Sequence, residues 1–208
     1  MKKLLICYVH GFNSAFSPEN DKVKALKAAF SNADVVGLKY DLEIDDFVGQ
    51  LRKDLNTKLE SDLYDSVLLV GSSLGGFLAD HLAKTTGYSA VLINPSIRPD
   101  VTLLKELGPK VNLTNAKNWN FTRHALYELK GLAEAYYPFE KPALRLVLLD
   151  KGDELLDYEL AVWHYKADAK VVVFEGGNHR FAHINEAMPE IVKLANTVVD
   201  AHPCLSKK

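Results

Sequence analysis

Hydrophobic residues of this 208-residue chain gather in short, nearly continuous runs, and longer segments of mixed polarity separate these runs. Short apolar runs are typical of strands that are covered on both faces, as in a parallel sheet. Six runs rich in Val, Ile and Leu therefore predict strands at Lys3–Val9, Ala33–Leu38, Ser66–Val70, Ala90–Ile93, Leu144–Leu149 and Lys170–Phe174.

The segments between these runs have helical spacing. Val23, Leu26 and Phe30, for example, fall on one stripe of a helix. Helices are predicted at Asp21–Phe30, Ile44–Leu59, Gly75–Lys84, Leu155–Ala167 and Ile184–Ala201. Strands that alternate with helices imply right-handed βαβ units and a doubly wound, mostly parallel sheet. The expected fold class is therefore α/β, in a single domain over residues 1–208.

One long segment, Asp100–Lys141, interrupts this alternation and contains no predicted strand. A structureless loop of that length is uncommon inside a compact domain. We therefore expect a short helical cap over the substrate site in this segment. The alternative is a plain excursion of the chain with no role in substrate binding.

Composition limits the possible partners. The net charge of −2 argues against binding to a nucleic-acid backbone, which requires a basic excess. The first apolar run stops at His10, which is too early for the core of a signal peptide, and no run reaches the roughly 18 apolar residues of a membrane helix. The two cysteines make neither a disulfide framework nor a zinc spacing. We expect a cytoplasmic protein that binds neither membranes nor nucleic acids.

The most informative motif is G-x-S-x-G at Gly71–Gly75, directly after a predicted strand and directly before a predicted helix. This context is that of a nucleophile elbow, in which a strained serine projects its hydroxyl outward and the flanking glycines avoid collisions. The N–H groups that begin the helix lie where negative charge develops during acyl transfer. Ser73 is thus the candidate nucleophile, and Ser72 is the weaker alternative.

A serine hydroxyl needs a nearby base, and the chain order for this elbow is serine, acid, histidine. His179 follows the last predicted strand, at the sheet edge where open α/β sheets assemble their sites, so we expect it to be the base. His183 completes the i, i+4 spacing of a zinc pair, but no Glu follows His179 and no third ligand is evident. We expect no metal and no organic cofactor, and we place His183 at a helix start or at the pocket edge.

The acid should follow the strand that precedes the histidine. Four carboxylates lie there, at Asp150, Asp153, Glu154 and Asp157. Asp153 lies in the turn and is the candidate that orients the imidazole. Asp150 ends the strand, with a plain turn residue as its other interpretation, whereas Glu154 and Asp157 stay open as alternatives that would equally serve the start of a helix.

A second donor to the oxyanion is expected from the loop after the first strand. Gly11 permits a close approach there, so the main-chain N–H of Phe12 joins that of Leu74 as an oxyanion donor. Asn13 follows directly and is a candidate pocket residue. His10 is interpreted as structural, with a direct catalytic role as the alternative.

Arg98 lies in the loop after the fourth predicted strand. It is a candidate for binding an anionic part of a substrate. The alternative is an ion pair that fixes this loop to a neighbouring carboxylate.

The motifs above resemble those of the YqiA-like esterases, a bacterial branch of the α/β-hydrolases. The matching segments are His10–Ser14, Gly71–Gly76, Asn94–Pro99, Gly152–Tyr158 and Glu175–His179. The resemblance implies a compact α/β-hydrolase that cleaves short-chain acyl esters or acyl thioesters through an acyl-enzyme on Ser73, and it favours Asp153 as the acid.

Two features depart from the family's pattern. Arg180 stands where a smaller residue is expected, and Asp100–Lys141 matches weakly and is expected to govern specificity. Because a fold alone does not establish activity, the alternative is a non-catalytic small-molecule binding or sensor protein on a hydrolase scaffold.

Overall fold

The computed structural model describes residues 3–60, 63–135 and 143–201. Six strands form a sheet in the order β2-β1-β3-β4-β7-β8, and each neighbouring pair is parallel. These strands are β1 Leu4–Val9, β2 Asp34–Gly37, β3 Ser66–Ser72, β4 Ser89–Ile93, β7 Arg145–Asp150 and β8 Lys170–Phe174. The predicted α/β fold with a doubly wound parallel sheet is confirmed.

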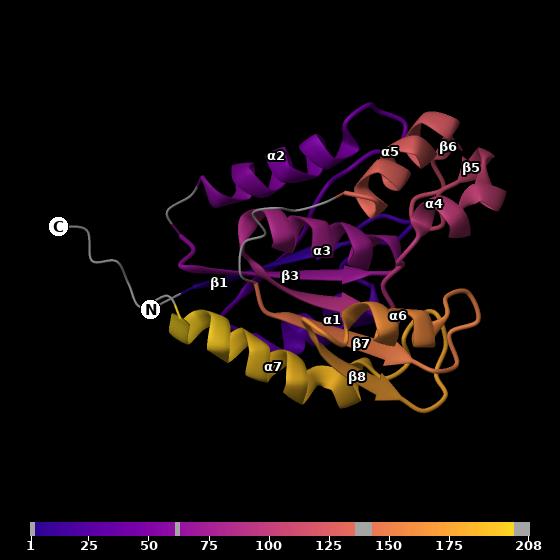
Figure 1. The fold of residues 1–208 in the computed structure, drawn as a ribbon. Helices are drawn as coiled ribbons and strands as arrows, with labels where there is room; N and C mark the ends of the chain where they lie inside the picture. Colours follow the sequence, from indigo (N-terminus) through magenta and orange to yellow (C-terminus); the bar gives the residue numbers. More distant parts are fainter. Residues whose placement is uncertain (1–2, 61–62, 136–142, 202–208) are drawn as a thin grey trace.

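Helices cover both faces of this sheet (Figure 1). One face is covered by α1 (Asp21–Ala29) and α7 (Ile184–Ala201), and the other by α2 (Phe47–Leu59), α3 (Leu74–Thr86) and α6 (Tyr158–Tyr165). Within the described part of the chain, no helix combines the length and the apolar character that a bilayer crossing requires.

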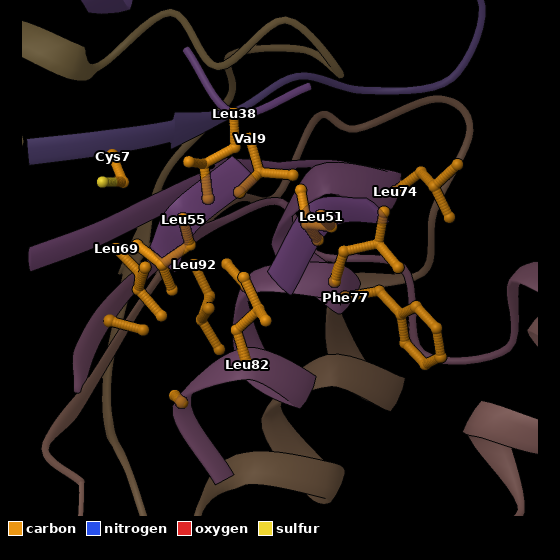
Figure 2. Packing of buried hydrophobic residues seen from close by; sticks show 14 of the residues in the cluster. Cys7, Val9, Leu38, Leu51, Leu55, Leu69, Leu74, Phe77, Leu82 and Leu92 are labelled. Carbon is orange, nitrogen blue, oxygen red and sulfur yellow. The ribbon is translucent and has the colours of Figure 1, made fainter. Parts of the chain in front are cut away.

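Successive residues of each central strand point into two separate cores. In β1, Leu5 and Cys7 join the core beneath α2 and α3, whereas Leu4 and Ile6 join the core beneath α1 and α7. Figure 2 shows the first of these cores, where side chains from α2 and α3 meet those of the strands. Burial on both faces explains why the strands are continuously apolar in sequence.

Two helices begin later than their apolar pattern predicts. α2 begins at Phe47 because the side chain of Asp46 accepts the Gly49 N–H at 2.9 Å and caps the helix. α6 begins at Tyr158 because Asp157 is its N-cap. In both cases the capping carboxylate, rather than the apolar spacing, determines the first turn.

The expectation that residues 100–141 contain no strand is wrong. This segment contains, within its described part, α4 (Pro99–Thr102), a 3₁₀ turn (Leu104–Glu106), β5 (Gly108–Val111), β6 (Asn118–Phe121) and α5 (Arg123–Ala133). β5 and β6 pair as an antiparallel hairpin. Each has four residues of alternating burial, so neither gives the continuous apolar signal that identified the other strands. Residues 136–141 lie outside the described residues.

The sheet order places a topological switch point between β1 and β3, because the chain runs outward from β1 to β2 on one side and from β3 to β4 on the other. Open α/β sheets bind ligands outside the carboxyl ends of the strands at such a point. The loops after β1, β3, β7 and β8, which carry the predicted site residues, leave this edge of the sheet (Figure 1).

We expect Leu69→Ala to lower the free energy of unfolding by about 2–5 kcal/mol, because the substitution leaves a cavity in a packed core. Leu69 is fully buried in β3, whereas Leu113 is 80% exposed and offers a matched control. Urea denaturation followed by circular dichroism measures both variants. A Leu69→Ala protein as stable as Leu113→Ala would contradict the described core.

Candidate active site

Ser73 forms the sharp bend between the end of β3 and the start of α3. Its backbone has φ 58° and ψ −123°, a conformation that costs a non-glycine residue about 1–3 kcal/mol. The Ser73 carbonyl accepts the main-chain N–H groups of Gly76 (2.9 Å), Phe77 (3.2 Å) and Ser96 (3.1 Å). These bonds hold the strained serine at the carboxyl edge of the sheet.

The glycines around Ser73 allow strand and helix to approach each other. A Cβ atom at Gly71 would overlap the Gly75 carbonyl oxygen, and a Cβ atom at Gly75 would overlap the carbonyl oxygen of Val9 in the adjacent strand. The G-x-S-x-G pattern therefore reflects a close backbone contact at both positions.

Three of the predicted residues meet at this bend. His179 Nε2 lies 3.0 Å from Ser73 Oγ, and His179 Nδ1 lies 2.9 Å from Asp153 Oδ2 and 3.0 Å from Asp153 Oδ1. The side chain of Asp153 is only 3% exposed. A proton on Nδ1 toward the carboxylate leaves Nε2 able to accept the proton of the Ser73 hydroxyl.

The other two candidate acids have separate roles. The Glu154 carboxylate accepts the main-chain N–H of His179 at 3.0 Å, and this hydrogen bond lowers the pKa of Glu154. Asp157 accepts the N–H groups of Glu159 and Leu160 as the cap of α6. Of these three carboxylates, the structure brings Asp153 to the imidazole.

The loop after β1 lies directly beside the serine. A Cβ atom at Gly11 would be 3.3 Å from the Ser72 carbonyl oxygen, closer than most Cβ contacts, and 3.4 Å from Ser73 Cβ, so glycine eases the approach of the loop. Within the described residues, no hydrogen bond joins the N–H groups of Phe12 and Leu74 to another protein atom. Both predicted donors are therefore unused by the part of the chain that the structure describes.

The β5–β6 hairpin holds this same loop. The Asn13 side-chain oxygen accepts the Trp119 indole N–H at 2.8 Å, and the Asn13 carbonyl accepts the Leu113 N–H at 2.9 Å. The Phe12 ring packs edge-on against Trp119 and Phe121. Asn13, predicted as a pocket residue, lines a cavity of about 160 Å³ and also ties the loop to the hairpin.

His10 has packing contacts. Its ring stacks on Tyr40 with centroids 4.4 Å apart, and its Nδ1 lies 2.9 Å from the Gly11 carbonyl oxygen. Burial lowers the pKa of His10, which favours the neutral ring. These contacts agree with the structural interpretation of His10.

Arg98 is engaged by a neighbouring carboxylate. Its Nε and a terminal nitrogen donate to the two oxygens of Asp100 at 2.8 and 2.7 Å. The structure thus shows the ion pair that was the alternative to substrate binding by Arg98.

His183 lies at the start of α7, where its carbonyl accepts the Ala187 N–H. Its Nδ1 is 2.7 Å from Asp150 Oδ1, and its ring stacks on Phe174. Of the two expected positions, the structure shows the helix start. His179 and His183 face different carboxylates rather than a common ligand.

Asp150 has a buried role that the sequence interpretation missed. It ends β7, as the sequence predicted, but its side chain has no exposed surface, unlike that of a plain turn residue. A carboxylate at the end of a strand, with two histidines further along the chain, was the available signal for a buried role.

The parallel sheet, its switch point and the serine bend define the α/β-hydrolase fold. The structure of Est1E from Butyrivibrio proteoclasticus with bound ferulic acid is similar, with a TM-score of 0.71 at 14% identity over 96% of this chain and 90% of that chain. A Pyrococcus furiosus esterase, PF2001, has a TM-score of 0.66 at 12% identity over 95% of this chain and 83% of that chain. The expected fold is confirmed by these similarities.

The chain belongs to the uncharacterised protein family UPF0227, whose model matches residues 5–196. A UPF0227 protein of Shewanella sp. (strain ANA-3) is 23% identical over 90% of this chain and 97% of the relative. Another, from Serratia proteamaculans (strain 568), is 25% identical over 90% of this chain and 96% of the relative. UPF0227 is the YqiA family, so the resemblance found in the sequence is confirmed.

Proposed function

We propose that this chain is a serine hydrolase that cleaves short-chain acyl esters or acyl thioesters through an acyl-enzyme on Ser73. The observation that carries the proposal is the hydrogen-bonded row from Asp153 through His179 to Ser73, with separations of 2.9 and 3.0 Å. A nucleophile, a base and a group that orients the base are thereby within reach of one another.

In the first step, Ser73 Oγ attacks the acyl carbonyl carbon while His179 Nε2 accepts the hydroxyl proton. Asp153 compensates the charge on the imidazolium. The carbonyl oxygen becomes an oxyanion, which the N–H groups of Phe12 and Leu74 stabilise together with the amino-terminal end of α3.

In the second step, the bond from the acyl carbon to the leaving oxygen or sulfur breaks, and His179 donates its proton to the leaving group. Water then attacks the acyl-serine while His179 takes a proton from the water. The carboxylic acid leaves, and Ser73 regains its proton. This sequence requires neither a metal nor an organic cofactor.

The similar structures support an ester as the substrate. The similar structures include one with bound ferulic acid and one described as an esterase, although these similarities establish only the fold.

The proposal is tested with p-nitrophenyl esters and acyl-CoA thioesters of increasing acyl length. We expect kcat/KM to be highest for the short acyl chains that the family resemblance implies and to fall as the acyl chain lengthens. If no member of either series turns over faster than with Ser73→Ala protein, the proposed function is wrong.

A further inference from the structure

Side chains at the ends of two strands hold the loop that carries His179 through hydrogen bonds. Asp150 Oδ2 accepts the N–H of Asn178 at 3.1 Å and the N–H of Ala182 at 2.8 Å, so it binds the loop on both sides of His179. Asn94, which directly follows β4, donates its side-chain N–H groups to the carbonyls of Asn178 (3.1 Å) and His179 (3.3 Å). The Asn94 side-chain oxygen accepts the Asp150 N–H at 2.9 Å.

The loop is folded tightly around the Asp150 carboxylate. Asp150 has no exposed surface, Asn94 is only 2% exposed, and a Cβ atom at Gly177 would overlap the Asp150 side chain. A buried carboxylate is costly unless hydrogen bonds and an opposite charge compensate it. The two N–H donors of the loop supply the hydrogen bonds.

His183 supplies the third hydrogen bond and a titratable positive charge. Its Nδ1 lies 2.7 Å from Asp150 Oδ1, and this contact raises the pKa of His183. A second cation, Lys22 on α1, donates its ammonium group to the Arg180 carbonyl at 2.6 Å, and burial lowers the pKa of Lys22 to about 8. Lys22 is close enough to interact with the Asp150 charge.

We propose that Asp150 and His183 are positioning residues, a second carboxylate–imidazole pair that holds the main chain on both sides of His179 and so sets the imidazole against Ser73. The inference rests on the proposed function. The Asp150 carbonyl accepts the main-chain N–H of Asp153 at 3.2 Å. Neither the Asp150 nor the His183 side chain hydrogen-bonds to the side chains of Ser73, Asp153 or His179, so both side chains act through the position of the loop.

The pair makes the anchoring dependent on pH. The charged groups that interact with His183 are Asp150 on β7 and Glu186 on α7, while Lys22 interacts with Asp150, Arg180 and Asp21. The pKa of His183 is raised in the folded protein. The stabilisation that its imidazolium gives to the loop is therefore complete below the ordinary pKa of histidine, and it is lost as pH rises through the raised value. The anchoring is therefore strongest on the acidic side.

Three substitutions test the proposal. We expect Asp150→Asn to lower kcat by about 10–100-fold with KM within about twofold, because a displaced base reduces the rate without removing substrate contacts.

The two His183 variants separate the hydrogen bond from the charge. His183→Leu removes both and should lower kcat. At a pH above the raised pKa of His183, His183→Asn should keep the kcat of the wild type, since its amide keeps an N–H donor. Below that pKa, His183→Asn should fall behind the wild type because it cannot become positive. Glu190→Gln on α7 is the matched control.

Hydrogen exchange of residues 175–183 provides a readout that does not depend on turnover. We expect faster exchange in Asp150→Asn, confined to this loop, and no change in Glu190→Gln. If Asp150→Asn keeps the kcat of Glu190→Gln, the positioning role is wrong. If the wild type hydrolyses no substrate, the proposed function fails, and the exchange alone decides: unchanged exchange overturns the anchoring and faster exchange supports it.

Discussion

Replacing Ser73 by alanine is expected to lower kcat for a p-nitrophenyl ester by about 10⁴–10⁶-fold, because loss of the nucleophile removes the covalent route and leaves only oxyanion and binding contributions. The strained backbone at this position is held by bonds to the Ser73 carbonyl, which alanine keeps. Folding should therefore be unaffected. Steady-state kinetics and a thermal melt measure the two effects separately.

Ser72→Ala is the matched control for this substitution. Ser72 is the preceding residue, is buried at the end of β3 and was the alternative nucleophile in the sequence. We expect Ser72→Ala to keep kcat within a few-fold of the wild type, because the Ser72 hydroxyl has no part in the proposed reaction. Equal losses in the two variants would contradict the role of Ser73.

Asp153→Asn is expected to lower kcat by about 10⁴-fold, because an amide can stabilise the wrong imidazole tautomer and cannot compensate the imidazolium. Its side-chain oxygen would still accept the N–H groups of Leu155 and Leu156, so the loop should keep its shape. Steady-state kinetics compare this variant with the wild type, and KM should change little.

Asp157→Asn provides the control for Asp153→Asn. Asp157 caps α6, and asparagine is as good an N-cap as aspartate, so neither stability nor turnover should change by much. A loss of activity in Asp157→Asn as large as in Asp153→Asn would show that the wrong carboxylate has been assigned to the imidazole.

The parts of the fold that the sequence predicted are those with strong local signals. The strands of the sheet are apolar because both of their faces are buried, and this signal predicted each of the six. The β5–β6 hairpin was missed because its short strands alternate in burial and its role depends on a contact between Trp119 and Asn13, far apart in the chain. Long-range contacts of this kind leave no local pattern.

The same distinction applies to the candidate site. Ser73 was identified from a strand-turn-helix context, and His179 and Asp153 from their places after strands. The role of Asp150 depends on N–H groups that reach it from 28 and 32 residues further along the chain. No spacing rule anticipates these contacts, because the side chain accepts main-chain donors whose residue types are immaterial.

Mapping a covalent adduct tests the central claim most directly. The folded protein is incubated with a fluorophosphonate, digested, and its peptides are analysed by mass spectrometry. We expect one adduct, on Ser73, formed rapidly in the wild type, slowly in Asp153→Asn and not at all in Ser73→Ala. Folded wild-type protein that stays unlabelled, or that carries the label on another residue, would contradict an acyl-enzyme at Ser73 and favour a binding protein on this scaffold.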